Sequence, residues 1–260
     1  MIMKSLKVIK IGGNIIDDQK SLDDFLETFT KIEDPKILVH GGGKIASEMA
    51  RSLDIPVKMF EGRRITDEAT LDIITMVFAG KINKSIVAKL QSTNCNALGL
   101  TGADGNTIEA DKRPVLKIDY GYVGDVKKVN FEIIETLISN YVTPVFCAIT
   151  HNKEGQLLNT NADTIATEIA MAFADSYNVE LYYCFEKNGA LKDINDEDSV
   201  IEQIDTISFK KLVSEGIITD GMLPKISNCI NAVNHNIDKV CIGKHDKLFT
   251  NKKGYTTIVK

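Results

Sequence analysis

Two runs of glycine, each placed after a short apolar stretch, are the parts of the sequence best suited to chemistry. Gly12 and Gly13 follow "LKVIKI", and Gly41 to Gly43 follow "KILVH". Glycine leaves its backbone N–H groups accessible to a phosphate or carboxylate, and a helix beginning at that point favours the anion further. Because ligands of an open α/β sheet bind beyond the carboxyl ends of its strands, we expect both runs to border one crevice.

The second run continues into Lys44, and a Gly-Lys pair also occurs in nucleotide-binding P-loops. That motif requires a hydroxyl residue after the lysine to hold magnesium, and another glycine five residues before the last one. Here Ile45 follows Lys44, and the upstream glycine is missing. The dinucleotide motif G-x-G-x-x-G also fails, because Ala46 occupies its third glycine position. An anion cradle and a simple tight turn remain as the two interpretations.

Lys10 is a candidate cation on the first predicted strand. It alternates with Leu6 and Val8, and therefore points to one face of a strand that is expected to be buried on both faces. A buried ammonium group is unfavourable without an anion nearby. The alternative is that this end of the strand is exposed and the Lys10 side chain is solvated.

Lys225 is a second candidate cation, at the start of a predicted helix. It follows Pro224, which suits an early helical position, in a helix expected to begin near Gly221. A cation in the first turn opposes the helix dipole unless an anion is bound nearby. The alternative is a solvated surface lysine.

Four polar residues complete the candidate set. Asp163, in "NTNADTIATEIA", stands where the N-cap of a helix is expected, and capping is its simplest role. Asn159 and Asn161 are typical loop residues whose amides could also orient a polar substrate. Arg64 precedes a long helical pattern and could fork onto a carboxylate, or else be a surface arginine.

The composition favours an ordinary globular protein. The 260 residues include 31 basic and 36 acidic side chains, scattered without the basic stripe that a nucleic-acid partner would require. The chain has no signal-peptide pattern and no uncharged apolar run of about 18 residues, so we expect a cytoplasmic protein with no membrane contact. The five cysteines lack zinc or C-x-x-C spacing and are expected to be reduced thiols.

Short apolar runs alternate with helical patterns, which predicts βαβ units and a mainly parallel sheet in an α/β fold. The long helical pattern at residues 67–91 is interrupted at Gly80 and has a broad apolar surface that could also form a dimer face. Residues 113–130 contain two extended stretches that predict a hairpin on the sheet edge. A composition shift near residue 176 divides one domain, residues 1–260, into an N-lobe of about 1–175 and a C-lobe of about 176–260. Other helices are predicted at residues 18–31, 44–53, 131–140 and 209–215, with one opening at Asp163.

Eight motifs occur in order along the chain: "VIKIGGN", "LVHGGGK", "EGRRITD", "GLTGADG", "GYVGDV", "LNTNADTIA", "GIITDGMLPK" and "GYTTIV". Each is weak alone, but in this order they resemble the N-acetylglutamate kinases of the amino acid kinase superfamily. The resemblance covers the whole chain. It implies a three-layer αβα sandwich, with an acyl amino acid and a dimer contact in the N-lobe and ATP in the C-lobe.

The implied reaction is transfer of the γ-phosphoryl group of ATP to the side-chain carboxylate of an N-acylglutamate, the second step of arginine biosynthesis. A carboxylate is already ionised at neutral pH, so the reaction needs no general base, and we expect no catalytic His or Cys. The main obstacle is repulsion between anions, which lysines, backbone N–H groups and Mg²⁺ can neutralise. The resemblance implies that Mg²⁺ is carried on ATP rather than by protein side chains.

The resemblance also implies roles for individual residues. Lys10 and Lys225 would stabilise the transition state, and Asp163 would hold both lysines in place. Gly12, Gly13 and Gly43 would bind the phosphoryl group, with Gly13 and Gly43 donating N–H groups to its oxygens. The acylglutamate would contact Gly42, Gly43, Arg64, Asn159 and Asn161, with Arg64 on its α-carboxylate. ATP would contact Glu186, Lys187, Asn188, Gly189, Ala190, Leu191, Ile217, Ile218 and Thr219.

The chain departs from the family pattern at several places. The nucleotide loop is usually "L-T/S-D-V-x-G-V/I-L" and is "YYCFEKNGAL" here, which we interpret as one residue longer. Lys44 stands where the family commonly has a proline. Only nine residues precede Lys10, without the N-terminal helix of hexameric, arginine-inhibited members, so we expect an arginine-insensitive homodimer. The acyl group, acetyl or succinyl, is left open. The rival interpretations are a kinase of glutamate, aspartate, carbamate or UMP, and a non-catalytic nucleotide-binding regulator.

Overall fold

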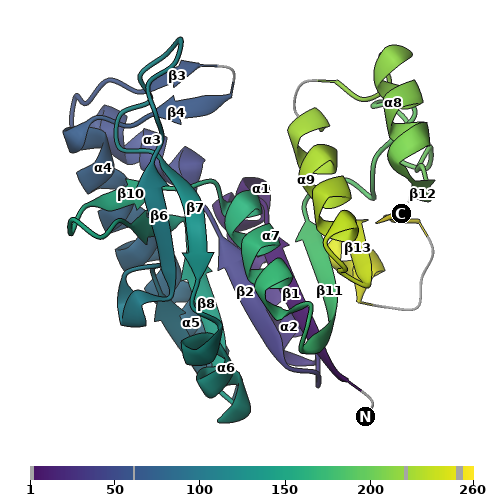
Figure 1. Cartoon of the computed structure of the whole chain (residues 1–260), viewed down its shortest axis with the longest axis horizontal. Coiled ribbons are helices and arrows are strands. Elements are labelled where there is room, and N and C mark those ends of the chain that lie inside the picture. Colours follow the sequence, from purple (N-terminus) through teal and green to yellow (C-terminus); the bar gives the residue numbers. More distant parts are fainter. Residues whose placement is uncertain (1–2, 61, 220–221, 250–253) are drawn as a thin grey trace. The chain divides into compact units, whose positions relative to one another are not determined.

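The computed structural model describes residues 3–60, 62–219, 222–249 and 254–260 (Figure 1). Packing divides the chain into two compact units. The first unit consists of Met1–Ile37 and Ala166–Lys260, and the second of Leu38–Ile165. The boundaries fall within β2 (Lys36–His40) and within α7 (Ala162–Phe173). The predicted functional lobes, divided near residue 176, stay a prediction.

The first unit has a mainly parallel sheet in which β1 (Lys4–Ile11) lies beside β11 (Tyr177–Cys184), and β11 beside β13 (Lys239–Gly243). The strand β14 (Thr256–Ile258) runs antiparallel to β13 and parallel to β12 (Gln203–Ile204). Side chains on both faces of β1 are buried, including Val8 and Ile9. Burial on both faces is typical of a central parallel strand, as the sequence predicts.

Two helices of the first unit begin at aspartates whose carboxylates accept hydrogen bonds from free backbone N–H groups. The carboxylate of Asp18 accepts a hydrogen bond from Ser21 at the start of α2 (Gln19–Thr30), and Asp205 forms a capping box at α8 (Thr206–Ser214). The buried Lys36 ammonium donates hydrogen bonds of 2.7–3.2 Å to three carbonyl oxygens at the end of α2. This unit also contains α1 (Gly13–Asp17), α9 (Leu223–Asn234), which packs on β13 and β14, and α10 (His245–Leu248) (Figure 1).

The second unit contains three parallel strands in the order β2, β8 (Thr143–Cys147) and β5 (Ala97–Leu100). The helix α3 (Gly43–Ser52) follows β2, and α6 (Phe131–Ser139) precedes β8. The segment predicted as one helix at residues 67–91 is continuous but not uniform. It consists of α4 (Glu68–Thr75), the π-helix η1 (Met76–Ile82) and α5 (Asn83–Ser92), so Gly80 lies in a widened turn rather than in a break.

Only the second strand of the hairpin predicted within residues 113–130 is found, so the prediction of its first strand is wrong. The strand β7 (Gly124–Val129) does form, but its antiparallel partner is β6 (Ile108–Lys112), upstream of the predicted segment. Both belong to a separate sheet with β9 (Ile149–His151) and β10 (Leu157–Asn159), rather than to the edge of the parallel sheet. A short hairpin of β3 (Lys58–Phe60) and β4 (Arg63–Ile65), and the 3₁₀ turn η2 (Asp104–Asn106), complete the unit.

The predicted α/β class with a mainly parallel sheet is confirmed. None of the five cysteines, all of which the structure describes, forms a disulfide, and four of them are buried. Among the described residues, no helix combines the length and the apolar character that a membrane crossing requires.

Candidate active site

The first group of predicted site residues gathers where β1 and β11 end. Lys10 is only 9% exposed and lies opposite Tyr183 in the strand register, so the alternative of a solvated strand end is wrong. The N–H of Gly12 donates to the carbonyl of Cys184 over 2.8 Å. A Cβ atom added to Gly12 would lie 3.3 Å from that oxygen and 3.4 Å from the Cβ of Phe185, so the two strand ends meet here almost without space for a side chain.

Phe185 links this strand end to the second predicted cation. The Nζ of Lys225 lies 5.8 Å from the centre of the Phe185 ring, in the range of a cation–π contact. Lys225 is in the first turn of α9, with Pro224 at an early helical position as predicted, while Gly221 lies outside the described residues. Sequence analysis missed Phe185, because a phenylalanine after an apolar strand indicates core packing. Its position directly after "VELYYC" was the one available signal.

Gly13 is the first residue of α1, a helix of five residues. A Cβ atom there would meet only the Asp17 carboxylate, at 3.8 Å, so its backbone is less crowded than that of Gly12.

The predicted nucleotide segment combines exposed and buried residues. The Gly189 backbone packs so closely on Thr256 that a Cβ atom would lie 2.6 Å from its Oγ1, and the N–H of Ala190 donates to the same oxygen over 2.8 Å. Glu186 is exposed, and Asn188 donates through Nδ2 to the Glu197 carbonyl over 3.0 Å. Lys187 forms an ion pair with Glu197 at 3.5 Å, and Leu191 forms a β-bridge with Val200. Of the remaining predicted residues, Ile217 is half-buried, Ile218 is buried and Thr219 is exposed. The buried members could contact a nucleotide only through their backbone atoms.

In the second unit, Gly42 requires glycine for two reasons. Its φ of 146° is one that L-residues rarely adopt, and a Cβ atom would overlap the Cδ1 of Ile82 and lie 3.3 Å from the Phe78 ring. Gly42 is the N-cap of α3, and Gly43 is its first residue. The run is therefore the beginning of a ten-residue helix packed against η1, as the alternation of strand, glycines and helix predicts.

Arg64 is tied to this glycine run. Its Nη2 donates to the Gly43 carbonyl over 2.9 Å and to the Ser47 hydroxyl over 2.8 Å. Both acceptors are neutral, and none of the acidic side chains that the structure describes forms an ion pair with this guanidinium. Burial, and to a lesser degree the nearby Arg51, lower the pKa of Arg64, so the site favours an anion beside it. The Arg64 side chain is therefore half-buried and held in place by hydrogen bonds, and its role in substrate binding stays a prediction.

Asn159 is held by its own unit. Its Nδ2 donates to the Thr66 hydroxyl over 2.9 Å, and its backbone N–H donates to Tyr122 over 2.9 Å. Thr66 is fully buried and was not identified from the sequence. This arrangement leaves the amide oxygen of Asn159 as the atom to accept a hydrogen bond from a substrate.

The N-cap of α7 is Asn161 and not Asp163, the residue predicted from the sequence. The Oδ1 of Asn161 accepts from the backbone N–H groups of Asp163 and Thr164, at 2.8 and 3.1 Å, so Asn161 and not Asp163 caps the helix. Asn161 would therefore contact a substrate through Nδ2 only. Asp163 is the second residue of α7, and its Oδ1 is buried. Its simplest role, capping, is thus taken by a neighbour.

The structure brings together Lys10, Gly12 and Lys225 in the first unit, and Gly42, Gly43 and Arg64 in the second. The two glycine runs belong to different units, so their common crevice stays a prediction, as do the roles of the individual residues. No cluster of metal-ligating side chains occurs among the described residues.

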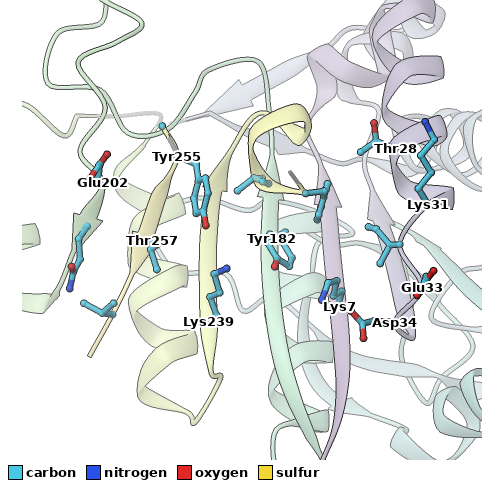
Figure 2. A pocket seen from close by; sticks show the side chains of 16 residues that line it. Lys7, Thr28, Lys31, Glu33, Asp34, Tyr182, Glu202, Lys239, Tyr255 and Thr257 are labelled. Atoms are coloured by element: carbon cyan, nitrogen blue, oxygen red, sulfur yellow. Dashed lines mark ion pairs between the residues drawn. The ribbon is translucent and has the colours of Figure 1, made fainter. Parts of the chain in front are cut away.

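A cavity of about 930 Å³ opens elsewhere in the first unit (Figure 2). It is lined by Lys7, Tyr182 and Lys239, which occupy the face of the sheet opposite to Lys10 because side chains alternate along each strand. Lys7 forms ion pairs with Asp34 and Glu180 at 2.7 and 2.9 Å, and these pairs raise its pKa although burial opposes them. None of the predicted site residues lines this cavity.

Known proteins of one family are similar to this chain in sequence. The model of the amino acid kinase family matches residues 5–244. A curated acetylglutamate kinase of Cytophaga hutchinsonii is 50% identical over 247 residues, which cover 95% of this chain and 94% of the relative. Another, of Parabacteroides distasonis, is 49% identical over 96% of this chain and 98% of the relative.

Among solved structures, the crystal structure of smu.665 from Streptococcus mutans UA159 is similar with a TM-score of 0.82 at 28% identity, over 98% of both chains. This similarity extends over both compact units, and the family model also matches most of the chain. The chain therefore belongs to the amino acid kinase family.

Proposed function

We propose that this protein is an N-acetylglutamate kinase, which transfers the γ-phosphoryl group of ATP to the side-chain carboxylate of the substrate in the second step of arginine biosynthesis. The observation that carries the proposal is 50% identity to an acetylglutamate kinase over 95% of the chain. The product is an acyl phosphate, formed when a carboxylate oxygen bonds to the γ-phosphorus and the bond from that phosphorus to the bridging oxygen of ADP breaks.

The acylglutamate is proposed to bind in the second unit. The Arg64 guanidinium is half-buried, is held by Gly43 and Ser47, and would fork onto the α-carboxylate with its remaining N–H groups. The oxygen of Asn159 would accept from the amide N–H of the substrate, and Asn161 would add its Nδ2. The N–H groups of Gly42 and Gly43 would bind substrate and phosphoryl oxygens.

The phosphoryl group is proposed to meet the cations of the first unit. Lys10 is buried at the end of β1, and Lys225 lies at the start of α9, so both can neutralise charge that develops on the transferred group. Gly13 would add its backbone N–H group, whereas that of Gly12 already donates to the Cys184 carbonyl, and Asp163 would orient the lysines. Because a carboxylate nucleophile is already ionised, no residue has to remove a proton.

The nucleotide is proposed to bind along residues 186–191 and 217–219. Mg²⁺ on the ATP phosphates would supply further charge neutralisation when it is bound. We also propose a cytoplasmic homodimer, which light scattering of the purified protein would test.

The test of the function is ADP release measured with a panel of acceptors. We expect turnover with N-acetylglutamate, and comparison with N-succinylglutamate defines the acyl preference. Activity with free glutamate, aspartate, carbamate or UMP but with neither acylglutamate would contradict the proposal. Nucleotide binding without turnover of any acceptor would favour a non-catalytic regulator.

A further inference from the structure

A buried histidine lies directly before the glycine run of the second unit. His40 is the last residue of β2 and has no exposed surface. Its Nδ1 lies 2.9 Å from the carbonyl oxygen of Gly41, and its Nε2 lies 3.0 Å from the Nδ2 of Asn83. The side chain therefore connects the glycine run to the first residue of α5, 43 positions along the chain.

The neighbours of Asn83 determine which way its amide points. Its Nδ2 is 2.9 Å from the carbonyl oxygen of Val145, which can only accept a hydrogen bond. Its Oδ1 is 3.1 Å from the ammonium of Lys84, which can only donate. A flipped amide would place donor against donor and acceptor against acceptor, so this orientation follows from the network.

The orientation of Asn83 in turn determines the tautomer of His40. Because Asn83 presents a donor, Nε2 must be the unprotonated, accepting nitrogen of the ring. The proton therefore resides on Nδ1 and is donated to the Gly41 carbonyl. Burial lowers the pKa of His40 to about 4, which agrees with a neutral ring at physiological pH.

This hydrogen bond restrains a peptide whose N–H belongs to the proposed substrate site. All peptide bonds of the described residues are trans, and in a planar trans peptide the C=O and N–H groups point in opposite directions. With the Gly41 oxygen held towards His40, the N–H of Gly42 points away from the ring. Ile82 and Phe78 of η1 pack where a Gly42 side chain would be, and limit movement on that face.

We propose that His40 is a positioning residue, locked by Asn83 as the neutral Nδ1–H tautomer, which orients the Gly41–Gly42 peptide so that the Gly42 N–H faces the acylglutamate. The inference rests on the proposed function for its purpose, but not for its geometry. Gly99 also supports this arrangement, because it leaves space for the Asn83 amide, whose Oδ1 a Cβ atom at position 99 would overlap.

The first test is NMR of protein labelled with ¹⁵N at its four histidines, with the His40 signals assigned from their loss in a His40 variant. We expect the Nδ1–H tautomer, unchanged down to about pH 5 because the ring titrates well below the ordinary range. An Nε2–H tautomer, or titration near the usual value of about 6.5, would overturn the inference. This result does not depend on catalysis, so it remains informative if the proposed function fails.

Asn83→Leu is the matching variant, because it removes the amide while His40 stays in place. We expect the Nδ1–H tautomer to remain, because the Gly41 carbonyl still accepts from Nδ1, and the Nε2 signal to shift because it loses the hydrogen bond from Asn83. An unchanged Nε2 signal in this variant would show that Asn83 does not donate to Nε2, and would overturn that part of the inference.

The second test compares two amides at position 40. His40→Asn keeps a donor near the Nδ1 position, whereas His40→Gln places its amide near Nε2 and leaves the Gly41 oxygen without the donor. We expect His40→Gln to lower kcat/KM for acylglutamate about tenfold, and His40→Asn to recover part of that loss, with the KM for ATP little changed in both. Equal losses in the two variants, or a loss expressed in the KM for ATP, would indicate general damage and overturn the positioning role. Thermal melting of both variants provides the control for folding.

Discussion

The glycine runs after β1 and after β2 look alike in the sequence but require glycine for different reasons. Gly12 has an ordinary extended backbone, with φ of −73°, and is constrained only by the closeness of Cys184 and Phe185. Gly42 has a backbone conformation that suits glycine alone and has no space for a side chain. Gly12 is therefore constrained by space alone, and Gly42 by both space and backbone conformation.

The surroundings of the two runs differ as well. Lys10 and Lys225 are the neighbours of the first run, so its environment is cationic. The second run is held by a hydrogen bond to the neutral ring of His40 and by another to Arg64. The hydrogen bonds that Arg64 donates to Gly43 and Ser47 also fix the position of its own guanidinium. We therefore propose that the first run serves phosphoryl transfer through charge, and that the second serves the acyl substrate through geometry.

The largest effect is expected from the cations of the first run. Lys10→Arg and Lys225→Ala should each lower kcat by about 100-fold to 1,000-fold, because each removes a charge or its placement from the transition state. Steady-state kinetics with circular dichroism would show lost turnover in a folded protein. Unchanged turnover in either variant would refute the assignment of that lysine.

Gly42→Ala tests the conformational difference between the two runs. Strain at φ of 146° together with the overlap with Ile82 should reduce the free energy of unfolding by about 3 kcal/mol. Gly12→Ala, the matched control, should reduce it by only about 1 kcal/mol, since alanine adopts its backbone angles. Urea unfolding measures both, and equal losses would mean that the two runs do not differ in this way.

Arg64→Lys tests whether the second run serves the acyl substrate. A lysine cannot contact Gly43 and Ser47 while forking onto a carboxylate, so the KM for acylglutamate should rise about 10-fold to 100-fold with a smaller change in kcat. Initial rates with each substrate varied in turn would separate the two constants. A rise confined to the KM for ATP would instead associate Arg64 with the nucleotide.

The smallest effect concerns the cap of α7. Asn161→Ala should lower the free energy of unfolding by about 1 kcal/mol, because the N–H groups of Asp163 and Thr164 lose their acceptor. Asn161→Asp keeps that acceptor and should retain most of the stability. A larger loss for the aspartate variant than for the alanine variant would show that capping is not the main role of Asn161.

The sequence was sufficient for features that depend on local pattern. Alternation along "LKVIKI" placed Lys10 on a face expected to be buried, with a solvated strand end as the alternative, and the structure shows that Lys10 is buried. Pro224 placed Lys225 in a first helical turn, as the structure confirms. These predictions succeed because strand alternation and helix starts are determined by neighbouring residues.

Features that depend on distant partners were missed or misplaced. The strand β6 reads "IEADK", with too few apolar residues to indicate a strand, so β7 was given the wrong partner. Asn161 and Asp163 are both good caps, and only the folded geometry distinguishes them. His40 and Asn83 are far apart in the sequence, and neither residue type by itself indicates that the two side chains are hydrogen-bonded to each other in the core.

The π-helix η1 has a consequence for the periodicity of the whole segment from α4 to α5. Leu71 and Leu90 are both buried although they are nineteen positions apart, which at about 100° per residue is about 100° beyond five full turns. A π turn accommodates one additional residue and so removes about that angle. The widened turn thus acts as a phase correction, which lets one apolar face continue through both helices and brings Asn83 towards His40. Deleting a single residue from this turn would leave these two leucines eighteen positions apart, which is five full turns of a regular α-helix, so the apolar face would stay continuous without the π turn. Winding the present residues into a regular α-helix would instead rotate one of its halves by about 100°.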